Sequence, residues 1–193
     1  MAVERLSQAS IGTLNKYSSM MAGSAFLTDF QLITTQVLSS AVASVTFSGI
    51  DQTYRHLQLR ITARDTSAGT SNGPLYMTFN GDSAGNYSVH RLSGNGSAVA
   101  SSSSTSSSSM WVGDSIASGS TAGVYGAAIV DILDYSQTTK YKTIRNLSGV
   151  TGTNIVDLTS GSWRNTAAVT SLTISAALAT TAVGSRFSLY GWN

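Results

Sequence analysis

The chain has 193 residues, enough for one all-β domain with an appendage, and 41% of them are hydrophobic, which excludes disorder of the whole chain. Only 10% of the residues are charged, the net charge is +2 and cysteine is absent, which excludes disulfides and cysteine-bound zinc. Because the bases are scattered and no apolar run resembles a signal peptide or membrane helix, we expect a protein made in the cytoplasm that binds neither nucleic acid nor membrane.

The first forty residues differ from the rest of the chain. Their apolar positions lie three to five residues apart, at Val3, Leu6, Ile11, Leu14, Tyr17 and Met21. Weak helix formers such as Ser10, Gly12 and Ser18 lie between them. A short amphipathic helix and an extended arm on a neighbouring subunit both remain open. We interpret residues 1–40 as an N-terminal attachment arm and residues 41–193 as the folded domain.

From residue 43 onward the apolar pattern has a period of two, which is typical of half-buried strands. Residues 56–64 alternate strictly, with Leu57, Leu59 and Ile61 on one face. Further strands are predicted at residues 75–79, 87–92, 110–112, 124–135, 141–147, 168–175 and 186–192. Residues 75–79 and 87–92 predict a hairpin across a turn-rich loop.

Short strands separated by Gly, Ser and Asn turns indicate an all-β antiparallel sandwich, for which a jelly roll is the preferred topology. The serine-rich run at residues 101–109 is typical of a flexible linker, and residues 149–162 are interpreted as a loop. The predicted core consists of Leu57, Leu59, Ile61, Phe79, Ile132, Leu172, Phe187 and Leu189.

Catalytic candidates are few. His56 and His90 lie on the polar sides of predicted strands, where a surface or interface role is expected. Residues 81–85 match the letters of a Gly-x-Ser-x-Gly nucleophile elbow around Ser83. A hydrolase elbow leads into a helix, but this segment leads into a predicted strand. The sequence therefore favours a plain loop over a nucleophile.

Metal and substrate sites are also not expected. Asn80, Asp82 and Asn86 place oxygen atoms in one loop, but the glutamate that closes a calcium loop is missing. Asp131 and Asp134 are three residues apart within a strand and so face opposite ways. Their expected partners are Lys140, Lys142 or Arg145. We expect no catalytic, metal or cofactor site and no enzymatic activity.

Aromatic residues are spread over the predicted strands, at Tyr54, Tyr76, Trp111, Tyr125, Tyr135, Trp163, Tyr190 and Trp192. We interpret them as core or interface anchors, with a carbohydrate-binding platform as the alternative.

Three segments form a recognisable set, namely residues 54–60 (YRHLQLR), 76–82 (YMTFNGD) with 86–87 (NY), and 185–191 (SRFSLYG). Residues 130–135 (VDILDY), 140–143 (KYKT), 163–168 (WRNTAA) and 17–23 (YSSMMAG) belong to the same set. Together these segments resemble small virion structural proteins of tailed bacteriophages. The resemblance covers about residues 45–192 and a patch in the arm, and rests on strand and turn patterns. It implies a phage particle and a β-sandwich.

The expected function is therefore a capsid decoration or cement protein on the virion surface. It would act as a homotrimer, bound to the major capsid protein or another virion protein through the arm. The alternative is a tail or head fibre protein that binds a host-surface receptor or glycan. Contacts to a shell protein would favour the first, and a free distal end with clustered aromatic residues the second.

Overall fold

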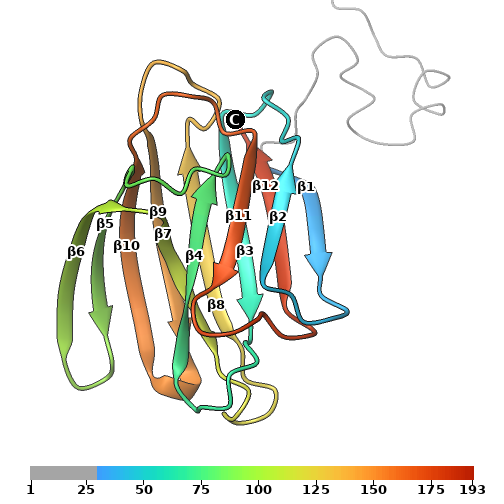
Figure 1. Cartoon of the computed structure of the whole chain (residues 1–193), viewed down its shortest axis with the longest axis vertical. Coiled ribbons are helices and arrows are strands. Elements are labelled where there is room, and N and C mark those ends of the chain that lie inside the picture. The colour runs from blue at the N-terminus through green and yellow to red at the C-terminus, as the bar shows by residue number, and fades with distance from the viewer. Residues whose placement is uncertain (1–29) are drawn as a thin grey trace, which may run out of the picture.

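The computed structural model describes residues 30–193, which form an all-β domain (Figure 1). The strands are β1 (Phe30–Val37), β2 (Ser44–Ser48), β3 (His56–Ala63), β4 (Asn72–Phe79), β5 (Tyr87–Gly94), β6 (Val99–Ser107), β7 (Met110–Ile116), β8 (Gly126–Leu133), β9 (Lys142–Val150), β10 (Ile155–Trp163), β11 (Ser171–Ala176) and β12 (Arg186–Trp192). A 3-10 turn, Thr151–Thr153, joins β9 to β10.

The strands form two sheets packed face to face (Figure 1). The large sheet has the order β1-β12-β3-β8-β9-β10-β5-β6, and the small sheet has the order β2-β11-β4-β7. Every strand pair in both sheets is antiparallel. The predicted class, an antiparallel β-sandwich, is confirmed.

The core lies between the sheets and follows from the alternation of apolar side chains. Strand β3 buries Leu57, Leu59 and Ile61, while β4 buries Leu75, Met77 and Phe79 from the opposite sheet. All eight predicted core residues are at most 2% exposed. The strand register inferred from period two is therefore correct for these elements.

The domain begins before the predicted boundary at residue 41. Strand β1 pairs with β12 and forms one edge of the large sheet, so residues 30–37 belong to the domain and not to an arm. Phe30 stacks on Tyr190 at 4.8 Å, and Thr35 and Ser188 share a 2.6 Å hydroxyl hydrogen bond. An edge strand with mostly exposed side chains lacks a buried stripe, which explains why the pattern did not predict it. The rest of the predicted arm, residues 1–29, lies outside the described residues.

The hairpin predicted for residues 75–92 is wrong. Strand β4 lies in the small sheet and β5 in the large sheet, so the intervening loop crosses between the layers. Tyr87 holds this crossing, because its buried hydroxyl accepts a 3.0 Å hydrogen bond from the Phe79 N–H and donates one of 2.9 Å to the Asp82 carbonyl. Burial raises the Tyr87 pKa to about 12.

Two segments interpreted as linker or loop are strands. The serine-rich β6 pairs with β5 at the second edge of the large sheet, and β10 pairs with both β9 and β5. Most β6 side chains are exposed on both faces, so no hydrophobic alternation marks the strand. Strand β6 is therefore defined by its backbone pairing with β5 and not by a side-chain pattern.

Candidate assembly surface

The outer face of the large sheet carries exposed apolar side chains where solvent-facing polar ones are usual. Ile129 of β8 is opposite Leu147 of β9, Leu147 is opposite Leu158 of β10, and Leu158 is opposite Leu92 of β5. These four residues, here called the apolar row, are 46–57% exposed. Val156 and Val99 extend the row on the same face and are 58% and 74% exposed. The row is thus continuous across neighbouring strands.

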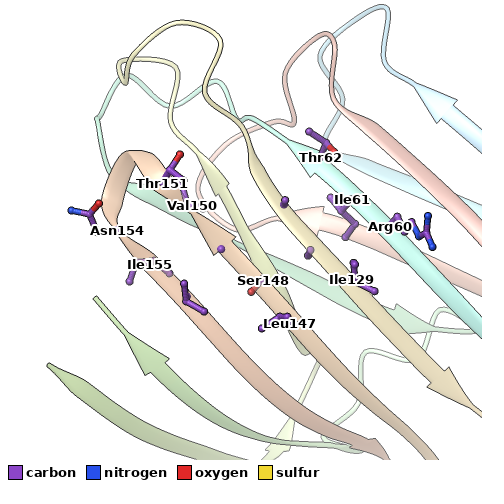
Figure 2. A pocket seen from close by; sticks show the side chains of 14 residues that line it. Arg60, Ile61, Thr62, Ile129, Leu147, Ser148, Val150, Thr151, Asn154 and Ile155 are labelled. Carbon is purple, nitrogen blue, oxygen red and sulfur yellow. The ribbon is translucent and has the colours of Figure 1, made fainter. Parts of the chain in front are cut away.

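A shallow hollow of about 840 Å³ lies beside the apolar row (Figure 2). It exists because Ala127 is opposite Gly149, two small residues between the larger Ile129–Leu147 pair and the β9–β10 turn. Figure 2 shows Ile129 and Leu147 on neighbouring strands, with Thr151 and Asn154 at the turn. The hollow is lined mainly by apolar atoms.

The two arginines beside the row make contacts within the domain. Arg60, opposite Ile129, lies over the rings of Phe30 and Tyr190 at 4.9 and 4.7 Å. Arg145 donates a 2.8 Å hydrogen bond to Asp131. Monomeric proteins rarely expose a large contiguous apolar area, and those that do use it for binding. An apolar centre with a polar rim is the usual anatomy of a protein interface.

The structure does not bring the two histidines together. His56 is on β3 and His90 is on β5, and three strands separate them in the sheet. His56 Nδ1 accepts a 3.0 Å hydrogen bond from the Asp134 N–H, and its ring lies 4.6 Å from that of Trp192. Burial lowers the His56 pKa. His90 is exposed on the outer face.

The loop that contains the Gly-x-Ser-x-Gly pattern connects β4 of the small sheet to β5 of the large sheet. It leads into strand β5, and Ser83 is exposed. Asp82 accepts hydrogen bonds from Trp163 Nε1 at 2.7 Å, Asn86 Nδ2 at 2.9 Å and the Ala84 N–H at 2.9 Å. These hydrogen bonds lower the pKa of Asp82, and the bond from Asn86 has the largest effect. The carboxylate therefore anchors the buried Trp163 to the loop.

Replacing Asp82 with alanine is expected to lower the free energy of unfolding by about 1–3 kcal/mol, because Trp163 Nε1 loses its acceptor in a buried position. Urea denaturation followed by tryptophan fluorescence measures this loss. The matched variant Ser83→Ala, in the same loop, is expected to unfold as the wild type does. Equal stability of the two variants would contradict the anchoring role.

The other predicted acidic residues form ion pairs. Asp131 pairs with Arg145, and Asp134 pairs with Lys140 and, at 3.3 Å, with Arg55. Two of the three expected partners are therefore found. Lys142 is instead buried, and its Nζ donates 3.0 Å hydrogen bonds to the carbonyls of Lys140 and Thr166. Burial lowers the Lys142 pKa.

The aromatic residues do not gather in one platform. Trp163 and Tyr135 are buried, whereas Trp192 lies against His56 and Tyr190 against Phe30 at the β1–β12 edge. Trp111 lies under the Arg91 guanidinium at 3.0 Å. The burial of Trp163 and Tyr135 agrees with the interpretation of aromatic residues as core anchors. The apolar row, by contrast, was not predicted.

Comparisons of the chain with protein-family models, curated proteins and solved structures found no match. In residues 30–193 no helix is long and apolar enough to cross a membrane. Over the same residues no group of three or more His, Cys, Asp or Glu side chains is placed to hold a metal ion. The fold and the surface together define an all-β sandwich with an exposed apolar row on the outer face of its large sheet.

Proposed function

We propose that this chain is a structural protein of a bacteriophage virion, a capsid decoration or cement protein that binds and stabilises the head shell as an oligomer. The observation that carries the proposed oligomer is the apolar row on the outer face of the large sheet. The proposed virion is supported by the resemblance of residues 54–60, 76–82 and 185–191 to phage virion proteins. The action of the chain is mechanical and not enzymatic: it adds buried interface between shell subunits, and a stable contact covers roughly 1,000 Å² or more.

The strand order supports a jelly roll, an architecture that viral capsid proteins use. A jelly roll has eight strands, numbered 1 to 8 in chain order. We assign β2 to β7 to strands 1 to 6, the meander β8–β10 to strand 7, and β11 to strand 8. With this assignment the small sheet has the order 1-8-3-6. The large sheet then contains the order 2-7-4-5, with β12 and β1 added at one edge. Under this assignment the two orders match those expected of a jelly roll whose seventh strand is expanded into a three-stranded meander, which supports the proposed topology.

The partner that covers the apolar row is proposed to be a second copy of this chain in a homotrimer. A trimer joins two different surfaces of neighbouring subunits. Phe30 and Leu32, at the β1 edge of the same sheet, are 39% and 53% exposed and supply the second apolar surface. The low charge of the chain suits a close contact of this kind. Residues 1–29 are left to contact the major capsid protein.

Replacing Leu147 and Leu158 with glutamate is expected to convert the trimer into monomers, because the two carboxylates would be buried without partners in the contact. Light scattering after size exclusion measures the mass, and circular dichroism checks the fold. Both side chains are more than half exposed in the single chain, so the fold is expected to persist.

The matched control is Leu178→Glu, because Leu178 is 64% exposed but lies outside the apolar row. This variant is expected to remain a trimer, with three times the mass of one chain. A monomeric wild type at micromolar concentrations, or a double variant that remains trimeric, would contradict the proposed contact.

A second candidate function is binding of a host glycan at a fibre tip. It is favoured by a hollow of about 250 Å³ between the sheets, where Tyr76 and Trp111 lie among serines of β6 and the β6–β7 turn. Aromatic rings with surrounding hydroxyl groups suit sugar rings. One face of Trp111 is however covered by Arg91, which leaves less aromatic surface for a ligand.

A further inference from the structure

A polar hollow of about 580 Å³, here called the end hollow, lies at the end of the sandwich near Asn193 (Figure 1). Three segments far apart in sequence form it: the β2–β3 connection, the β8–β9 turn and the residue that follows β12. Small-molecule sites usually have volumes of roughly 300–1,000 Å³. The end hollow shares no lining residue with the apolar row. It is therefore a separate candidate site of suitable size.

One carboxylate holds two cationic side chains in the lining of the end hollow. Asp134 contacts Lys140 Nζ through one oxygen, and its other oxygen accepts a 3.3 Å hydrogen bond from Arg55 Nε. The bond from Lys140, as the largest cause, lowers the pKa of Asp134. The backbone of Asp134 is fixed in turn, because its N–H donates a 3.0 Å hydrogen bond to His56 Nδ1 and its carbonyl accepts one of 3.1 Å from the Gln137 N–H. The two cations are thus positioned before a ligand arrives.

These ion pairs leave donors and positive charge unused. Arg55 binds Asp134 through Nε, and its two terminal nitrogens make no hydrogen bond within residues 30–193. The side chains of Arg55 and Lys140 are 69% and 55% exposed. Two cations against one carboxylate leave one positive charge in the lining. A guanidinium with free terminal nitrogens is a preferred partner of carboxylates. The lining therefore suits a ligand with one negative group.

The rest of the lining consists mostly of amide and hydroxyl groups. Within residues 30–193 the Gln137 amide and the Thr53 hydroxyl make no hydrogen bond, and Asn193 uses only its Oδ1, which accepts the Arg55 N–H at 3.0 Å. Amides and hydroxyls both donate and accept hydrogen bonds, as the hydroxyl groups of sugars do. An acidic peptide would also need apolar pockets for its other side chains, and the end hollow offers few apolar atoms. A sugar fits this lining better than a peptide.

We propose that the end hollow binds an acidic sugar. The sugar carboxylate lies against Arg55 and Lys140, and the sugar hydroxyl groups lie against the amides and hydroxyls of the lining. The spare positive charge selects an acidic sugar over a neutral one. This site goes beyond the proposed role on the virion and does not depend on it, because the end hollow and the apolar row lie on different parts of the domain.

The test is ligand-observed nuclear magnetic resonance of the full chain titrated with glucuronate. Glucose serves as the uncharged sugar and acetate as the carboxylate without a sugar. Glucuronate is expected to bind with a millimolar dissociation constant, as a ligand of its size usually does. Glucose and acetate are expected to bind at least about tenfold more weakly, because each lacks part of the matching groups.

The variant Arg55→Gln is expected to weaken glucuronate binding by about tenfold or more, because the carboxylate loses its charged donor. The matched control is Arg186→Gln, an exposed arginine at the opposite end of β12 from Asn193, and it is expected to bind as the wild type does. Both variants change exposed side chains, so circular dichroism is expected to show the wild-type fold.

Four results would overturn the proposal. They are no detectable glucuronate binding by the wild type, equal binding by Arg55→Gln and Arg186→Gln, acetate binding as tight as that of glucuronate, and tighter binding of tetraglutamate, an acidic peptide. None of these results bears on the proposed trimer, which the mass of the Leu147 and Leu158 variant tests.

Discussion

Replacing Leu59 with alanine is expected to lower the free energy of unfolding by about 2–5 kcal/mol. Leu59 is fully buried in β3, with Leu189 of β12 and Val130 of β8 opposite it on either side. Both neighbours are held by strand pairing and cannot collapse into the space left by the isobutyl group. The loss therefore includes the cost of a cavity as well as the lost burial. Urea denaturation followed by circular dichroism measures it.

The matched control is Thr62→Ala, an exposed position on the outer face of the same strand. Its expected change is within about 0.5 kcal/mol, as for most surface substitutions. If Leu59→Ala cost no more than Thr62→Ala, the assignment of Leu59 to the core between the sheets would be contradicted.

Under the proposed function, deleting residues 2–29 is expected to abolish attachment to virions that lack the full-length protein, while the β-sandwich and the proposed trimer persist. Deleting the whole predicted arm, residues 1–40, would also remove β1, leave the edge of β12 unpaired and expose Tyr190, on which Phe30 stacks. Sedimentation of mixed particles and truncated protein measures attachment.

Two controls accompany this deletion. Circular dichroism and light scattering establish that the truncated protein is folded and trimeric, and the full-length chain establishes that the particles can be decorated. If the truncated protein unfolds or becomes monomeric, residues 1–29 belong to the domain or to its trimer. If it still decorates particles, attachment lies on the sandwich and the proposed role of residues 1–29 fails.

The sequence predicted strands best where one face is buried and the other is exposed to solvent. In β3 strict alternation places Leu57, Leu59 and Ile61 in the core, and the structure confirms each. Strands at the edges of the large sheet were missed for the opposite reason. Strand β6 is exposed on both faces and β1 nearly so, so neither carries a buried stripe for a pattern to detect.

The candidate site was the least predictable part. In β10 the alternation of Val156 and Leu158 with Asp157 and Thr159 signals a strand, but the apolar side faces out and the polar side faces in. Only the partners explain this reversal: Asp157 binds Arg91 of β5, which lies far from it in sequence. The charge of Asp157, between the apolar Val156 and Leu158, is the signal in the sequence that could have indicated a special environment.

The hairpin error has a similar origin. A short turn-rich loop between two alternating segments predicts a hairpin, because local patterns do not record which sheet each strand joins. Strand β4 pairs with β11, which follows it by about a hundred residues, and β5 pairs with β10 and β6. Long-range pairing of this kind is set by the whole fold.

The central proposal, that this chain decorates a phage head, is tested most directly by a cryo-electron microscopy reconstruction of phage particles incubated with the purified chain. The account predicts the two-sheet domain as trimers on the outer surface of the head, with the apolar row of Ile129, Leu147, Leu158 and Leu92 covered by a neighbouring copy. Density for the domain at the distal tip of a fibre, or on the head with this row open to solvent, would contradict it.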